Sequence, residues 1–72
     1  MTDIERLKSW MATNGYDKKS LAARMDERYI TLWAMMNRNK PSDRFVSNFI
    51  RHFGCDEALK IFADHLAPAT QQ

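Results

Sequence analysis

Basic side chains are concentrated in the middle of this 72-residue chain. Residues 18–51 carry eight Lys and Arg side chains against three Asp and Glu, which makes a net charge of +5, whereas residues 1–17 carry −1 and residues 52–72 carry −2. Lys and Arg bind phosphate oxygens, and a positive charge confined to one region favours docking of that region on a polyanion. A solvated face without a partner explains a charge excess of this size equally well, so charge alone leaves both interpretations open.

The sequence contains few residues in patterns that would support nucleophilic catalysis, acid–base catalysis or metal binding. Cys55 is the only cysteine, which excludes an internal disulfide and favours a reducing compartment. A zinc site would have to recruit His52 and His65 without a second thiol. Neither histidine lies in a recognisable Ser/His/Asp or paired-carboxylate pattern, and two glycines are too few for a phosphate-cradling loop. We therefore expect no enzyme, no catalytic residue, no metal site, no cofactor and no small-molecule ligand.

Length and composition predict one all-α domain. A chain this short needs a small, locally connected core, which a compact helical bundle provides best. Its 44% hydrophobic and 28% charged residues are typical of globular proteins. No apolar run approaches the ~18 residues of a membrane-spanning helix, and no basic segment with an apolar core opens the sequence. A cytoplasmic location without membrane insertion is expected.

Capping residues and apolar spacing predict five helices. Thr2 followed three residues later by Glu5 is typical of a capping box, and Gly15 supplies a stop. The second and third helices have almost no linker between them, so they must cross steeply. The domain is expected to span residues 1–67, followed by a flexible C-terminal tail at 68–72. The helices are expected over about residues 3–14, from Asp17 to near Asp26, over 28–38, from Ser42 to Gly54, and from Asp56 to about Leu66.

Ideal helical steps divide the third predicted helix into two faces. Leu32 and Met35, flanked by Met36 and Tyr29, are expected to face the core. The opposite, outer face has the width and exposure that fit the major groove of duplex DNA, where residues near the N-terminus of a helix reach base edges. The outer face carries Ile30, Trp33, Ala34 and Asn37, with Arg28 at the N-terminal end and Arg38 at the C-terminal end.

Basic residues are expected on both sides of this outer face. The N-terminus of the second helix offers free backbone N–H groups, and Lys18 and Lys19 add two ammonium groups, which together predict a phosphate clamp. Arg38, Lys40 and Arg44 are expected to grip phosphates on the other side. Duplex DNA is therefore the predicted partner.

Several short motifs match a known family. They are Leu21-Ala22 in the second helix, Leu32 and Met35 in the third, the loop Asn37-Arg38-Asn39-Lys40-Pro41-Ser42, and Gly54-Cys55-Asp56 before the last helix. Over about residues 4–66 the sequence resembles the helix-turn-helix regulators of the phage Cro and repressor type, also called the Xre-like family. The resemblance implies a lambda-repressor-like fold with the helix-turn-helix in helices two and three, a phage or prophage origin, and transcription regulation by occupation of an operator.

The resemblance also implies roles for single residues. Lys18 and Arg44 match positions that contact the DNA backbone. The family usually has glycine at Asp26 and an apolar residue at Glu27; Asp can adopt the left-handed conformation that the turn needs, but an acidic pair beside the groove works against phosphate binding. The positions expected to face bases or the adjacent sugar-phosphate are Arg28, Tyr29, Ile30, Trp33, Ala34 and Asn37.

The outer face is unusually apolar for this role, which leaves an alternative open. Trp33 and Ile30 can pack on thymine methyl groups or on sugars, whereas Arg28, Asn37 and Tyr29 supply the hydrogen bonds to base edges. An exposed Trp beside an Ile is also typical of a protein-binding surface. The alternative is an interaction module that binds a partner protein, such as an antagonist of a regulator.

A DNA-binding domain of this size is expected to act as a homodimer on a palindromic site, because one copy offers few base contacts. The last predicted helix carries more apolar residues than one core face requires. We predict that the dimer surface consists of Leu59, Ile61, Phe62 and Leu66.

Overall fold

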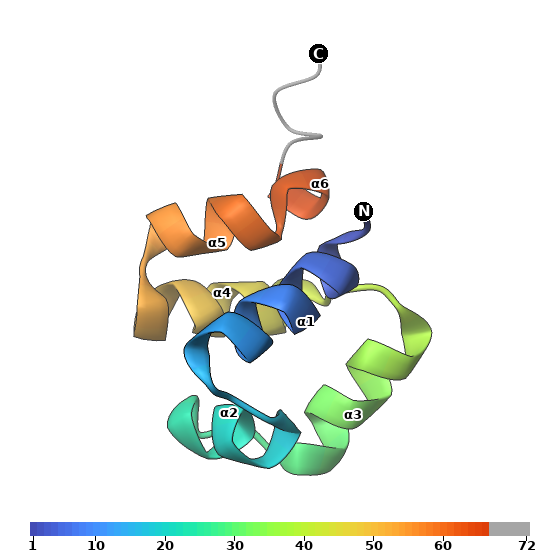
Figure 1. Ribbon diagram of the computed structural model, residues 1–72, viewed down its shortest axis with the longest axis vertical. Helices are drawn as coiled ribbons and strands as arrows, with labels where there is room; N and C mark the ends of the chain where they lie inside the picture. Colours follow the sequence, from blue (N-terminus) through green and yellow to red (C-terminus); the bar gives the residue numbers. More distant parts are fainter. Residues whose placement is uncertain (67–72) are drawn as a thin grey trace.

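The computed structural model of the protein describes residues 1–66, and every regular element in that range is an α-helix. The helix α1 runs through the middle of the molecule, with α2 and α3 on one side of it and α5 and α6 on the other (Figure 1). The predicted tail at 68–72 lies outside the described residues. No described helix has both the length and the apolar content needed to span a membrane. The helices are α1 (Asp3–Asn14), α2 (Lys18–Arg24), α3 (Tyr29–Arg38), α4 (Asp43–Phe53), α5 (Cys55–Ile61) and α6 (Ala63–Leu66).

The predicted caps are present at the helix ends. The Thr2 hydroxyl accepts from the Glu5 N–H at 3.2 Å, and the Thr2 N–H donates to the Glu5 carboxylate at 2.8 Å, which completes the capping box of α1. Gly15 ends this helix with a φ of +76°, a left-handed conformation that glycine adopts without strain. Asp17 and Ser20 form a second capping box at the start of α2, and the Ser42 hydroxyl caps α4 by accepting from the Phe45 N–H. The first four helices therefore begin and end close to the predicted residues.

Aromatic rings on α4 hold the core together. Phe49 is fully buried, and its ring packs against four others at centroid distances of 4.7–6.4 Å. These rings come from α1, from α4 itself and from the residue that follows α5, so one side chain links three parts of the chain. The four rings belong to Trp10, Phe45, Phe53 and Phe62.

The last predicted helix is wrong in one respect, because the structure divides it into α5 and α6. In a continuous α-helix the Ile61 carbonyl would accept from the His65 N–H. Instead, Arg6 Nε donates to the Ile61 carbonyl at 2.9 Å, and the His65 N–H donates to the Asp3 carboxylate at 2.8 Å. The Asp64 N–H also donates to Asp3, at 3.0 Å. Two side chains of α1 thus satisfy the backbone groups that the break releases, and the described residues form six helices rather than the predicted five.

The predicted dimer surface is also wrong in part. Ile61 and Phe62 are 2% and 0% exposed, because α5 packs against both α1 and α4 and so buries more than one of its sides. Leu59 is 50% exposed and Leu66 is half-buried against the core. Of the four predicted residues, these two alone can touch a second copy of the folded chain.

Candidate nucleic-acid interface

The helix α3 lies at the edge of the molecule beside α2, with one side on the core and the other facing outward (Figure 1). Leu32, Met35 and Met36 are buried, as predicted. On the outer face Ile30 is 56% exposed and Trp33 is 44% exposed. Asn37 is exposed as well, and Ala34 is half-buried. For these residues the helical spacing assigned the two faces of α3 correctly.

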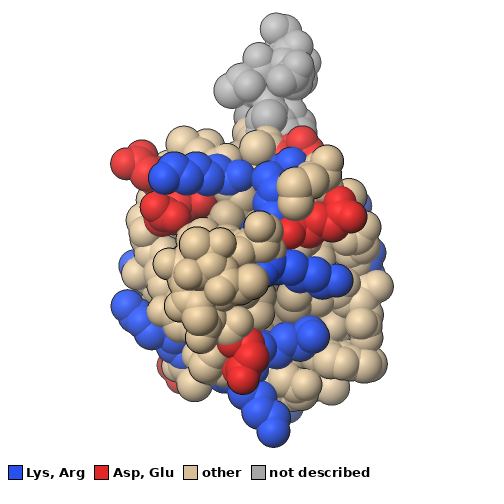
Figure 2. Space-filling view, viewed as in Figure 1, with Lys and Arg blue, Asp and Glu red and all other residues tan. Residues whose placement is uncertain are grey.

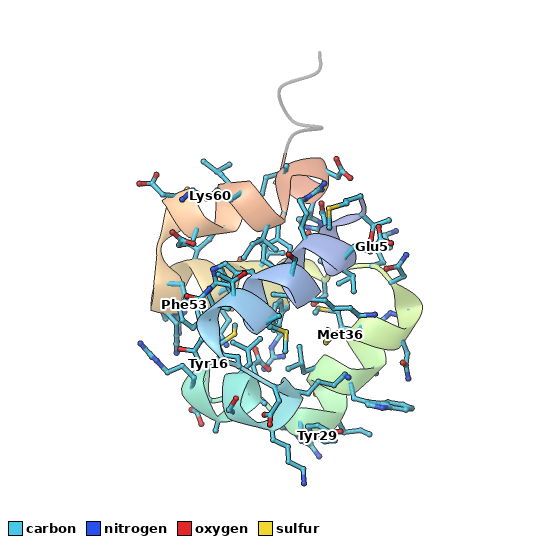
Figure 3. All side chains as sticks on the ribbon, in the orientation of Figure 1. Glu5, Tyr16, Tyr29, Met36, Phe53 and Lys60 are labelled. Atoms are coloured by element: carbon cyan, nitrogen blue, oxygen red, sulfur yellow. The ribbon has the colours of Figure 1, made fainter. Side chains whose placement is uncertain are left out.

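Tyr29 does not face the core, contrary to the prediction. Its side chain is 43% exposed, because it stands at the first position of α3, beyond the part of the helix that the core covers. Figure 3 shows it at the end of the molecule where α2 and α3 meet. It lines a hollow of about 370 Å³ together with Asp17, Lys18 and Lys19. The structure thus brings one residue predicted to read bases next to two residues predicted to bind phosphate.

The N-terminus of α2 is less open to an anion than predicted. The Asp17 carboxylate accepts from the Ser20 N–H at 2.7 Å, which occupies one of the free N–H groups. This backbone hydrogen bond, with a further one to the Ser20 side chain, lowers the pKa of Asp17, so the residue carries a negative charge at neutral pH. Lys18 and Lys19 form no ion pair within the described residues. A phosphate at this place would therefore be held mainly by the two lysines.

The turn between α2 and α3 contains the two acidic residues Asp26 and Glu27. Asp26 has a φ of +55°, the left-handed conformation that was expected of it. The side chain of Glu27 is 3% exposed, and its carboxylate accepts from Asn48 Nδ2 at 2.8 Å. Asn48 Nδ2 also donates to the Met25 carbonyl at 2.9 Å. Glu27 therefore attaches the turn to α4, and its carboxylate is not free in the way that the sequence suggested.

Sequence reasoning missed the role of Asn48 and misjudged that of Glu27. The two residues are 21 positions apart, and no local pattern pairs an amide on one helix with a carboxylate in a distant turn. Arg44 completes this group, because its guanidinium lies 3.3 Å from the Glu27 carboxylate. Its side chain is 74% exposed, so it remains accessible to a phosphate but is already engaged with an acid.

Replacing Glu27 by Gln tests whether this ion pair competes with DNA. The amide oxygen still accepts from Asn48, whereas Arg44 loses its charged partner and becomes free for a phosphate. We expect duplex affinity at low salt to rise about twofold to fivefold, as for release of a surface ion pair, with little change in the melting temperature. Glu57→Gln is the matched control, because it makes the same charge change on α5. An equal rise in both variants would contradict the local explanation.

Most other cations of the central segment have no acidic partner. Arg28, Arg38 and Lys40 are exposed and form no ion pair in the part of the chain that the structure describes. In Figure 2 several Lys and Arg side chains surround the end formed by α2, whereas most Asp and Glu side chains of this view lie towards α5 and α6. Lys40 lines a separate hollow with Pro41 and residues near the chain's N-terminus. The residues predicted to bind phosphate thus lie at separate places around α3.

Comparisons with family models, curated proteins and solved structures find no match for this chain. Its own residues combine an exposed helix, cations at both ends of that helix and an apolar stripe between them. Such an arrangement can bind the phosphate backbones of a nucleic acid through the cations, while the outer face of the helix contacts the base edges between the two backbones.

Proposed function

We propose that the chain is a sequence-specific duplex-DNA-binding transcriptional regulator of the Cro and repressor type. In this proposal α2 and α3 form the helix-turn-helix, and α3 enters the major groove and occupies an operator. The observation that carries the proposal is the set of cations around the exposed face of α3 that have no ion-pair partner among residues 1–66. Two acids close to them in sequence are engaged with other residues, since Glu27 accepts from Asn48 on α4 and Asp43 lies 2.6 Å from His65 Nε2. Asp26, two residues before Arg28, remains exposed.

The contacts divide into two kinds. Lys18 and Lys19, at the start of α2, bind phosphates and position the domain on the duplex without reading sequence. Arg28 is the N-cap residue of α3, and its exposed guanidinium forms no ion pair among the described residues, so it is available to donate to a base edge. Asn37, on the same outer face near the C-terminal end of α3, adds a side-chain amide that can pair with adenine.

A homodimer on a two-fold-symmetric site is part of the proposal, because one copy of this domain presents few base contacts. Leu59 on α5 is an apolar residue that is 50% exposed and available for a contact between copies. The helix α5 lies on the opposite side of α1 from α3 (Figure 1).

A second candidate function is binding of a partner protein through the same helix. The observation that favours it is the grouping of Tyr29, Ile30 and Trp33, which are large exposed apolar side chains within the first half of α3. Such a group resembles the apolar centre of a protein interface. The dependence of affinity on salt concentration distinguishes the two functions. Counterion release makes DNA affinity fall steeply as salt is raised, whereas the affinity of an apolar protein contact changes little.

Selection from a pool of random duplexes, at low and at near-physiological salt, tests the proposal directly. We expect enrichment of a short, roughly two-fold-symmetric motif whose affinity falls with salt. Lys18→Ala should weaken binding to all duplexes alike and reduce the salt slope by about one. Lys8→Ala is the control, because Lys8 is exposed and outside the basic segment. If no duplex is enriched at either salt, α3 is a protein-binding surface and partner capture should replace DNA selection.

A further inference from the structure

We propose that the outer face of α3 recognises its DNA site through the 5-methyl groups of thymine. This inference rests on the proposed function, and it names the chemical feature of DNA that the helix reads. The stripe that faces outward consists of Ile30, Trp33, Ala34 and Asn37, at the i, i+3, i+4, i+7 spacing of one helical face.

The middle of this stripe offers apolar surface in place of hydrogen-bonding groups. Ile30 and Trp33 are about half exposed and stand one turn apart, and Ala34 adds a methyl group beside them. The indole N–H of Trp33 is the single polar atom of these three side chains. Asn37 and Arg28, which can pair with base edges, stand at the two ends of the helix.

The major groove has one apolar group for such a surface to contact. Guanine and adenine present acceptor atoms there, adenine and cytosine present an amino group, and thymine presents its C5-methyl group beside the O4 acceptor. An Ile or Trp side chain pressed on an amino or carbonyl group removes water from it without replacing the lost hydrogen bond, which is unfavourable. The same side chains on thymine methyl groups bury apolar surface on both partners. The stripe therefore favours thymines over the other bases.

The charges beside the stripe favour DNA over an apolar protein surface as its partner. Cations without an ion-pair partner in the described part of the chain stand at both ends of α3, with Lys18, Lys19 and Arg28 near its start and Arg38 at its end. An apolar partner would bring these charges close to a surface that cannot solvate them. A phosphate backbone on each side of the groove neutralises them while the apolar stripe lies on the bases between.

Deoxyuridine substitution tests the inference, because it removes the methyl group and leaves the hydrogen-bonding edge of the base pair intact. Each thymine of the duplex obtained by selection is replaced in turn, and affinity is measured at constant salt. We expect about a fourfold loss for each methyl group under α3 and no change at thymines outside the contact. Ile30→Ala should reduce the difference between thymine and uracil at one position. Lys18→Ala is the control, because it should weaken both duplexes equally and keep their ratio.

The outcomes separate this inference from the function on which it rests. If the wild-type protein selects a duplex but binds the uracil and thymine forms equally well, the methyl-reading inference is overturned and DNA binding stands. If no duplex is selected, both fail together. The uracil series uses the unaltered protein, so its result does not depend on whether a variant folds.

Discussion

Replacing Asp3 by Ala is expected to lower the free energy of unfolding by about 3 kcal/mol, because the Arg6 guanidinium and two backbone N–H groups of α6 lose their buried acceptor together. The side chain of Asp3 is 4% exposed. Its carboxylate accepts from the N–H groups of Asp64 and His65 and pairs with Arg6, whose pKa it raises. Without it, the start of α6 has no cap.

Chemical denaturation followed by circular dichroism measures this loss. A domain of this length has a total stability of roughly 4 to 10 kcal/mol, so the variant should unfold at a much lower denaturant concentration. Asp43→Ala is the control, since Asp43 also holds α6, through His65 Nε2, but is 94% exposed. An exposed pair contributes less than about 1 kcal/mol. Equal losses in the two variants would show that burial of Asp3 is not what stabilises α6.

Replacing Arg28 by Ala is expected to reduce affinity for the selected duplex by about 1 to 3 kcal/mol and to relax the preference at one base pair. The N-cap position places Arg28 at the end of α3 that enters the groove first in the proposed complex. A bidentate contact from Arg to guanine gives discrimination of this size. The loss should therefore depend on the base offered, unlike the uniform loss expected of Lys18→Ala.

Binding isotherms on the selected duplex and on its single-base variants measure the effect. Arg24→Ala serves as the control. Arg24 is the last residue of α2, at the opposite end from Lys18, and its guanidinium lies 5.2 Å from the centre of the Phe53 ring. It should leave both affinity and base preference unchanged. If Arg28→Ala weakened every duplex by the same factor, Arg28 would be a phosphate contact and its proposed reading role would be wrong.

The sequence by itself determined the features that depend on neighbours three or four residues away. The capping box of α1 joins Thr2 and Glu5, and its stop at Gly15 needs only the freedom of a glycine backbone. The two faces of α3 follow from helical spacing, which places Leu32 inside and Ile30 outside. These contacts form within one helical turn, so a pattern of residue types is enough to predict them.

Only the tertiary structure decided the features whose partners are far apart in the chain. The break after Ile61 exists because Asp3 and Arg6 take its backbone hydrogen bonds from 55 to 62 residues away. The burial of Phe62 and the binding of Glu27 to Asn48 likewise depend on how the helices pack. A carboxylate has the same sequence letter whether it caps a distant helix, fastens a turn or faces solvent, and only the packed fold supplies the partner that distinguishes these roles.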